Sequence, residues 1–423
     1  MKRTLKHGLA LLLAILMLLS LAACGGSPQG NGDTPSNTGT NPPSSSGSKN
    51  DVADINDGVT KIALLISGDL GDMSFWDSAN AGMTQFAADH PDVVVDILEM
   101  GSSDTTKYES TLTQTANKDY DLIIVGTTDM REALQRLVKK DKYADRRFII
   151  FDTEIKDNAA ADFPTVHSIM FNQNEGGYLA GVLAAMMSSN TGAENTAFIG
   201  GTKNDIINDF GYGFMQGVQA ANQAKGTNIG AYNSYIGDFS NSPKGSSLAT
   251  GFYTSGVEIL FAAASQAGLG CIDAAKTNGK MLIGVDSDQY AFYADSDPDK
   301  ANCIITSVLK RVDLVLYECC EQFMAGTLTY GDLQVVGLAD GMVGLVKNDR
   351  YTAAVPQDIR DYVESVESQI IAGTLTVESG LKRYTSQDTL NSLIDSLVPT
   401  KLYGRAVADA EHHHALSQWC SGQ

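Results

Sequence analysis

Aromatic, carboxylate and amine side chains recur directly after short apolar runs along this 423-residue chain. Asp72, Ser74, Phe75 and Trp76 follow the first run, and Asp129 follows a later one. Aromatic faces stack on flat heterocycles, while carboxylates accept hydrogen bonds from N–H and hydroxyl groups. A nucleoside presents a flat heterocycle together with both kinds of donor, so these residue types predict a site for such a ligand.

The second half of the chain repeats this pattern. Phe210 follows the run at 196–200, Ser265 follows that at 256–262, and Asp286 and Asp288 follow that at 281–285. Lys310 comes just after the run at 303–308. All of these side chains would have to meet in one cleft for the ligand hypothesis to hold.

The apolar runs themselves predict the elements that would bring the side chains together. Most are four to seven residues long and almost continuously apolar, which is typical of strands buried on both faces of a parallel sheet. The strands are expected at 61–67, 93–98, 122–126, 148–151, 166–171, 196–200, 256–262, 281–285 and 303–308.

Amphipathic helical patterns separate these strands, as in the face shared by Phe75, Ala79, Met83 and Phe86. The alternation predicts a doubly wound α/β architecture, and the number of strands favours two lobes. Ligands of open parallel sheets bind at the carboxyl ends of the strands, where the polar residues lie.

The amino-terminal segment indicates export. Three cationic residues precede an apolar run at 9–23 that is too short for a membrane-spanning helix, which is typical of a secretory signal. Cys24 directly follows Leu-Ala-Ala, a pattern that resembles the lipidation site of bacterial lipoproteins. An ordinary signal peptide with an incidental cysteine is the alternative. We expect residues 1–23 to be removed and Cys24 to anchor the protein to the extracytoplasmic face of the cell membrane. Residues 24–57 are rich in Gly, Ser, Pro and Asn, so we expect them to form a flexible linker.

Charge and cysteine content exclude several other classes. A formal net charge of −20 without a basic cluster opposes nucleic-acid binding. No C-x-x-C pair occurs in the sequence, and we expect no cofactor and no metal. Adjacent Cys319 and Cys320 are expected to lie in a helix and to pack in the protein core. The Asp-rich segment 295–299 lacks the glycine and distant glutamate of a calcium loop, which favours a solvated turn. The histidines at 412–414 are expected in an exposed tail.

Six motifs, in order, resemble the basic membrane protein family of substrate-binding lipoproteins, which includes purine nucleoside receptors of ABC importers. They cover roughly residues 60–360 and are Asp72–Phe75, Phe171–Gly176, Gly200–Gly201, Phe210–Phe214, Gly284–Asp288 and Thr306–Val312. The resemblance implies a type I periplasmic-binding-protein fold, with two lobes that close over ligand about a hinge. We expect one lobe at 58–170 plus 305–335, the other at 171–304 plus 336–400, and a tail at 401–423.

The resemblance also implies residue roles. Phe75 and Phe210 match the family's purine-stacking aromatics, although one or both could instead be core phenylalanines. Asp129 matches the aspartate that reads the purine edge, and a helix N-cap is the competing interpretation. Asp286 matches the aspartate that holds ribose hydroxyls, with Asp288 as the nearby alternative, and Lys310 matches the lysine beside it.

Two positions depart from the family pattern. Trp76 replaces the usual asparagine, so it could extend the stack or fill the space that a purine needs. The turn at 264–268 carries Ser265 and Gln266 where bare backbone is usual. Both changes lie at the expected site, which leaves a modified nucleoside open as the ligand.

The implied function is a non-catalytic, monomeric receptor that captures a purine-type nucleoside and delivers it to the permease and ATPase subunits of an ABC importer. An extracellular sensor of the same fold, which binds a modified nucleoside or a sugar and signals, is the alternative. A nucleoside hydrolase is a third class, but the aspartate-rich calcium site that its chemistry needs is missing after the first strand.

Overall fold

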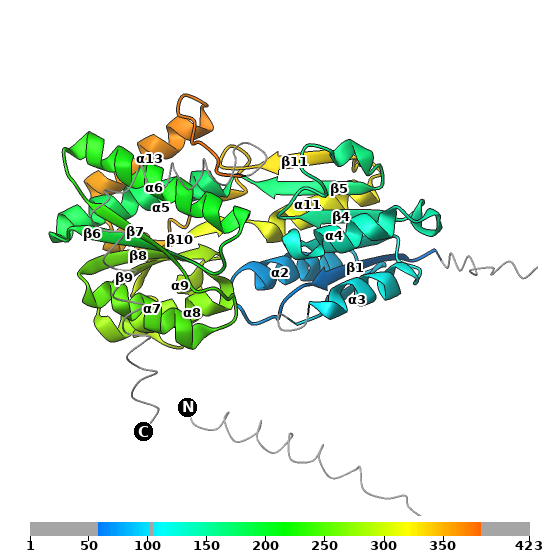
Figure 1. Ribbon diagram of the computed structural model, residues 1–423, viewed down its shortest axis with the longest axis horizontal. Helices are drawn as coiled ribbons and strands as arrows, with labels where there is room; N and C mark the ends of the chain where they lie inside the picture. Colours follow the sequence, from blue (N-terminus) through cyan, green and yellow to red (C-terminus); the bar gives the residue numbers. More distant parts are fainter. Residues whose placement is uncertain (1–57, 102–104, 382–423) are drawn as a thin grey trace, which may run out of the picture. The chain divides into compact units, whose positions relative to one another are not determined.

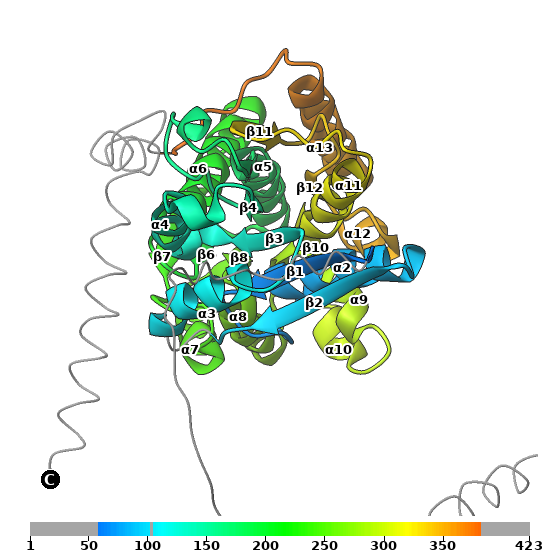
Figure 2. The same cartoon turned by 90° about the vertical axis from the view of Figure 1, so that its right-hand side faces the viewer.

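The computed structural model describes residues 58–101 and 105–381 of the chain. Two six-stranded sheets form the centres of two lobes, which Figure 1 shows side by side. Figure 2 looks from the first lobe toward the second. The predicted signal segment, Cys24, the linker, the histidines and the tail all lie outside the described residues.

The first sheet has the order β11-β5-β4-β3-β1-β2, and all of its strands run parallel. Its strands are β1 (Thr60–Ile66), β2 (Val93–Glu99), β3 (Leu122–Gly126), β4 (Arg147–Phe151), β5 (Val166–Phe171) and β11 (Asp332–Val336). The accompanying helices are α2 (Phe75–Asp89), α3 (Thr106–Ala116), α4 (Thr127–Val138), α11 (Val312–Met324) and the 3₁₀ turns η1 (Asp141–Tyr143) and η2 (Ala160–Asp162).

The second sheet has the order β12-β10-β9-β8-β6-β7, in which only β12 is antiparallel. Its strands are β6 (Asn195–Gly200), β7 (Gly230–Tyr235), β8 (Val257–Ala263), β9 (Met281–Asp286), β10 (Ile304–Lys310) and β12 (Val343–Leu345). Its helices are α5 (Gln173–Thr191), α6 (Asp205–Lys225), α7 (Ser242–Thr254), α8 (Ser265–Asn278), α9 (Gln289–Tyr293), α10 (Pro298–Ala301), α12 (Asp349–Ala354) and α13 (Gln357–Ile371).

Apolar side chains on both faces of each strand form separate cores above and below each sheet, as the continuous apolar runs predict. In the second lobe, α5, α6 and α13 lie on one side of the sheet and α7 and α8 on the other (Figure 1). Cys319 and Cys320 are buried in the core of the first lobe, which confirms their predicted role.

The chain crosses between the lobes three times, after β5, after β10 and after β11. The expected boundary at residue 305 therefore differs from the structure. Residues 305–310 belong to β10, which pairs with β9 and β12 in the second sheet, so this crossing begins after Lys310. An apolar run reveals a strand but carries no information about which of two sheets the strand joins.

Hydrogen bonds tie the three crossings to one another. The N–H of Asn172 donates to the carbonyl of Val336 at 2.7 Å, and the N–H of Leu338 donates to the Glu175 carboxylate at 2.8 Å. The N–H of Arg311 donates to the carbonyl of Met342 at 2.8 Å. The Phe171–Gly176 motif thus supplies part of the connection between the lobes.

Helices α5 and α6 pack backbone to backbone, because glycines face each other along the contact. A Cβ on Gly177 would lie 2.3 Å from the carbonyl oxygen of Phe210, and one on Gly213 would lie 2.0 Å from that of Asn174. No side chain fits at such distances. This close contact fixes the start of α6, which carries Phe210.

Candidate ligand-binding site

A cavity of about 470 Å³ lies between the carboxyl ends of the strands of the two sheets. This volume is within the ordinary range for small-molecule sites. Eight of the ten predicted side chains line the cavity, and they come from both lobes: Asp72, Phe75, Trp76, Asp129, Phe210, Ser265, Asp286 and Lys310. The strand-end rule therefore brings together most of the residues that the sequence singles out.

Phe75 and Phe210 line the cavity from opposite lobes. Phe75 stacks on Phe151 with ring centroids 5.6 Å apart, and Phe210 contacts Phe261 edge to face at 5.9 Å. Both rings are thus supported from behind by core phenylalanines. The stacking and core interpretations are compatible, because each ring belongs to its lobe's core and also borders the cavity.

The ammonium of Lys310 lies over both of these rings, 5.4 Å from the centroid of Phe75 and 5.5 Å from that of Phe210. The two centroids are therefore at most about 11 Å apart. A planar ring stacked between them needs about 7–8 Å at ordinary contact distances, which is below this limit. Lys310 also lies 5.1 Å from the ring centroid of Phe171, so three aromatic rings surround its ammonium.

Trp76 contacts Phe75 edge to face, with ring planes at 79° and centroids 4.9 Å apart. This orientation does not extend a parallel stack on Phe75. The indole lies against Gly68, where an added Cβ would come within 2.3 Å of Nε1. The absence of a side chain at Gly68 thus makes room for the larger ring beside the cavity.

Asp129 is the third residue of α4, whose N-cap is Gly126. The competing interpretation of Asp129 as the N-cap is therefore wrong, because the helix begins at Thr127, three residues earlier than an N-cap at Asp129 implies. Among the described residues, no hydrogen bond or ion pair engages its carboxylate. The residue is exposed toward the cavity, yet the surrounding walls remove enough water to raise the pKa of its carboxyl.

Asp72 accepts hydrogen bonds from the backbone N–H groups of Ser74, Trp76 and Asp77, so its carboxylate caps the first turn of α2. Its Oδ2 also accepts from the hydroxyl of Ser265, at 2.7 Å, in the other lobe. Burial raises the pKa of this carboxyl, and the four hydrogen bonds oppose that rise.

Asp286 ends β9 and accepts a hydrogen bond on Oδ2 from the hydroxyl of Ser74. Burial raises the pKa of Asp286 to about 7, against the opposing effects of the Lys310 charge and the Ser74 hydroxyl. No described residue donates to its Oδ1. Ser74 is fully buried and does not line the cavity, so its hydroxyl serves to bind Asp286 and does not face a ligand.

Lys310 forms an ion pair with Asp152, which directly follows β4. Both side chains are buried, and burial raises the pKa of the Asp152 carboxyl while the lysine opposes that rise. Asp152 is not among the residues that the sequence pattern singles out. The signal was present, because Asp152 follows its strand just as the predicted residues follow theirs.

Asp288 lies outside the cavity lining. Its carboxylate caps α9 by accepting from the N–H of Ala291 at 3.3 Å, and it accepts from the Asn348 amide at 3.0 Å. These contacts leave Asp286 as the better placed of the two sequence candidates for a ligand hydroxyl.

Non-glycine residues with left-handed backbone gather around the cavity. Met73, Thr127, Asp152, Ser265 and Asp286 have φ values of 50°, 68°, 60°, 48° and 66°. Each follows or ends a strand at the edge that faces the other lobe. Such conformations cost energy and persist where the surrounding structure enforces them, which is typical of functional sites.

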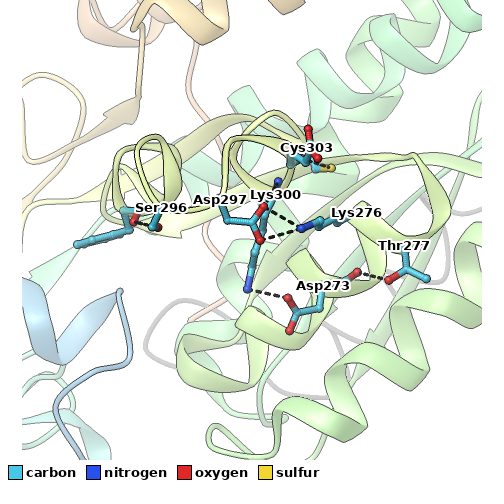
Figure 3. Close-up of polar contacts among 9 residues, drawn as sticks. Asp273, Lys276, Thr277, Ser296, Asp297, Lys300 and Cys303 are labelled. Carbon is cyan, nitrogen blue, oxygen red and sulfur yellow. Dashed lines mark hydrogen bonds and ion pairs between the residues drawn. The ribbon is translucent and has the colours of Figure 1, made fainter.

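The Asp-rich segment 295–299 is occupied by protein contacts, which Figure 3 shows. Asp297 pairs with Lys276 through both carboxylate oxygens at 2.8 Å and accepts from the backbone N–H of Lys300 at 3.1 Å. Across residues 58–101 and 105–381 there is no group of three His, Cys, Asp or Glu side chains placed to bind a metal ion. Within the same ranges, no helix combines the length and apolar character that crossing a bilayer requires.

Two lobes of this topology, enclosing a ligand-sized cavity at their strand ends, define a type I solute-binding protein. A crystal structure of an ABC transporter solute-binding protein from Aeropyrum pernix K1 has the same fold. Its TM-score is 0.68 at 24% identity, and the match covers 80% of this chain and 97% of that one.

The chain belongs to the family described as ABC transporter substrate-binding protein PnrA-like, whose model matches residues 59–379. It is 30% identical to Basic membrane protein A of Borreliella afzelii, over 77% of this chain and 94% of that protein. It is also 30% identical to the CD4+ T-cell-stimulating antigen of Listeria monocytogenes, over 74% of this chain and 85% of that protein. Members of this extracytoplasmic family bind small molecules and work with permeases.

Proposed function

We propose that this protein captures a purine-type nucleoside between its lobes and delivers it to an ABC import permease. The observation that carries the proposal is the pairing of two supported aromatic rings, one from each lobe, with an unpaired carboxylate in the same cavity. A purine base would stack between Phe75 and Phe210, at about 1–3 kcal/mol for each stacked face.

The polar groups fit the remaining parts of a nucleoside. The free carboxylate of Asp129 accepts N–H donors and so favours guanine or hypoxanthine, whose edges present them. The open Oδ1 of Asp286 accepts a ribose hydroxyl, and Lys310 retains donors beyond its pair with Asp152. We propose binding without catalysis, because the matching family and fold are those of substrate-binding proteins.

Delivery follows from closure about the hinge. Ligand stabilises the closed state only by binding it more tightly than the open one, and the permease would receive the closed form. We further propose that a monomer works at the extracytoplasmic face, anchored through lipid on Cys24. Mass spectrometry of the mature amino terminus tests the anchor, and uptake of labelled inosine by cells lacking the gene tests import.

The binding test is calorimetric titration with inosine, guanosine, adenosine, hypoxanthine, ribose and myo-inositol. Tight binding of a purine nucleoside, with much weaker binding of the free base and the free sugar, is expected. Equal affinity for hypoxanthine and inosine would exclude the sugar contact. Binding of a sugar alone would replace the nucleoside proposal with the sugar-binding alternative. Release of hypoxanthine from bound inosine would contradict the non-catalytic role.

Matched substitutions separate ring stacking from core packing. Phe210→Leu keeps much of the apolar volume but removes the stacking face, so it should weaken inosine binding at least tenfold. Phe261→Leu makes the same change in the supporting ring, which does not line the cavity, and should affect stability more than affinity. Asp129→Asn should reduce the preference for inosine over adenosine, and an unchanged ratio would remove Asp129 from base recognition.

A further inference from the structure

Two serine–aspartate pairs join the lobes in opposite directions. Ser74 of the first lobe donates to Asp286 of the second, while Ser265 of the second lobe donates to Asp72 of the first at 2.7 Å. Each lobe therefore supplies one hydroxyl and one carboxylate. These bonds connect loops at the strand ends, so they have to break when the lobes separate about the hinge.

The loop that carries Ser74 makes two further contacts with the second lobe. The Ser287 hydroxyl donates to the carbonyl of Ser74 at 3.3 Å, and the Gln289 amide donates to the carbonyl of Met73 at 3.2 Å. The segment between β1 and α2 thus docks against the ends of β8 and β9. Four hydrogen bonds join this one segment to two loops of the second lobe.

The groups that form the two pairs are held by contacts or by backbone conformation within their own lobes. Three backbone N–H groups of the first lobe fix the Asp72 carboxylate. Ser265 and Asp286 hold left-handed backbone conformations, and their side chains pair with residues of the first lobe. Groups that are already ordered lose little freedom when they pair, so the bonds favour closure strongly for their number.

We propose that Ser265–Asp72 and Ser74–Asp286 form a latch that stabilises the closed lobes whether or not ligand is present. Asp72, Ser74 and Ser265 then act as positioning residues for closure, and Asp286 does so through Oδ2 while its Oδ1 stays open to ligand. A latch of this kind contributes the same amount with every ligand, so it sets the affinity scale while the cavity walls set selectivity. This inference is independent of the nucleoside assignment.

The first test uses protein without ligand. The chain contains two tryptophans, of which Trp76 lines the cavity, so a Trp419→Phe background leaves Trp76 as the single tryptophan, which can be excited selectively over tyrosine. Opening the cleft exposes Trp76 to acrylamide. In this background, Ser265→Ala and Ser265→Gly should both increase quenching of Trp76, with circular dichroism confirming that each variant is folded.

Ser265→Gly relieves the left-handed backbone while Ser265→Ala retains it, yet both remove the hydroxyl. Equal increases in quenching support the latch, whereas parent-like quenching in either variant overturns it. Ser78→Ala is the matched control, because the N–H of Asp313 donates to the Ser78 hydroxyl at 3.1 Å within the first lobe. Its quenching should equal that of the parent, and an increase as large as that of Ser265→Ala would overturn the latch.

The second test compares ligand dissociation in stopped flow. Loss of one hydroxyl–carboxylate bond should speed the release of inosine and adenosine by the same factor, about tenfold. Unequal factors would identify Ser265 as a ligand contact and overturn the latch. Failure of both nucleosides to bind contradicts the proposed function instead, and the quenching test still decides the latch.

Discussion

Ligand affinity should depend on pH, because closure buries the Asp286 carboxyl. Its pKa is raised to about 7 by burial, and the neighbouring Asp72 and Asp152 carboxyls add to that rise while Lys310 and Ser74 oppose it. In the open state the carboxyl meets water, and its pKa should return toward the ordinary value of about 3.9. The closed form therefore binds more protons than the open form between these two values.

The sign follows from this difference. Closure takes up a proton, so it is favoured as the pH falls from 8 toward 6 and the effect saturates below the open-state pKa. With a closed-state pKa of about 7, affinity should rise about tenfold between pH 8 and pH 6. Above pH 8 both forms are ionised, and affinity should become independent of pH.

The measurement is calorimetric titration of inosine at pH 6, 7 and 8, in buffers of different ionisation enthalpy at pH 7. The buffer dependence counts protons directly, and about half a proton should be taken up at pH 7. Asp286→Asn should flatten the profile, whereas Asp288→Asn, which changes the nearby helix cap, should retain it. A flat profile in the parent, or an undiminished one in Asp286→Asn, would refute the reasoning.

Three further predictions concern packing. Gly181→Ala places a Cβ 2.0 Å from a carbonyl oxygen of α6 and should reduce the free energy of unfolding by about 1–3 kcal/mol in denaturant titrations. Gly251→Ala is the control, because an added Cβ there meets open space on α7. It should raise the free energy of unfolding by up to about 1 kcal/mol. Gly68→Ala should push the Trp76 indole toward the cavity and weaken inosine binding in calorimetry, while unchanged affinity would show that the indole is free to shift elsewhere. Asp209 accepts hydrogen bonds from the Ser379 hydroxyl and the Gly380 N–H, so Asp209→Asn should weaken these contacts and lower the melting temperature in calorimetry. Because burial raises the pKa of Asp209 to about 6, the stability advantage of the parent should shrink as the pH rises from 4 to 6.

Much of the fold follows from the sequence because the signal is local. Nine apolar runs correspond to nine strands, since a strand covered on both faces needs apolar residues at every position. The strands β7, β11 and β12 were not predicted. They lie at sheet edges, where one side is open, and their sequences Gly230–Tyr235, Asp332–Val336 and Val343–Leu345 mix polar residues with apolar ones or are only three residues long.

The site could be predicted as a set of residues but not as a set of contacts. The strand-end rule brings Phe75, Asp129, Phe210 and Asp286 to one cavity because parallel strands end at the same edge. It does not reveal that Asp286 meets Ser74, because that contact joins residues more than two hundred positions apart. Which side chains of the two lobes contact each other depends on their positions in three dimensions, and the spacing of residues along the sequence does not give these positions.

Residues that are bonded between the lobes and residues that are not should affect ligand binding differently: the first set affinity and the second set selectivity. Asp72, Asp286 and Lys310 are carboxylates and an amine that a sequence would assign to the ligand, yet each is already bonded to a residue of the other lobe. These bonds between the lobes favour closure around any ligand that fits. The side chains of Phe75, Phe210 and Asp129 make no hydrogen bond or ion pair across the cleft among the described residues, so discrimination among purine bases falls to them. Substitutions in the first group should therefore change the affinities for different purine nucleosides in parallel, and substitutions in the second should change their order.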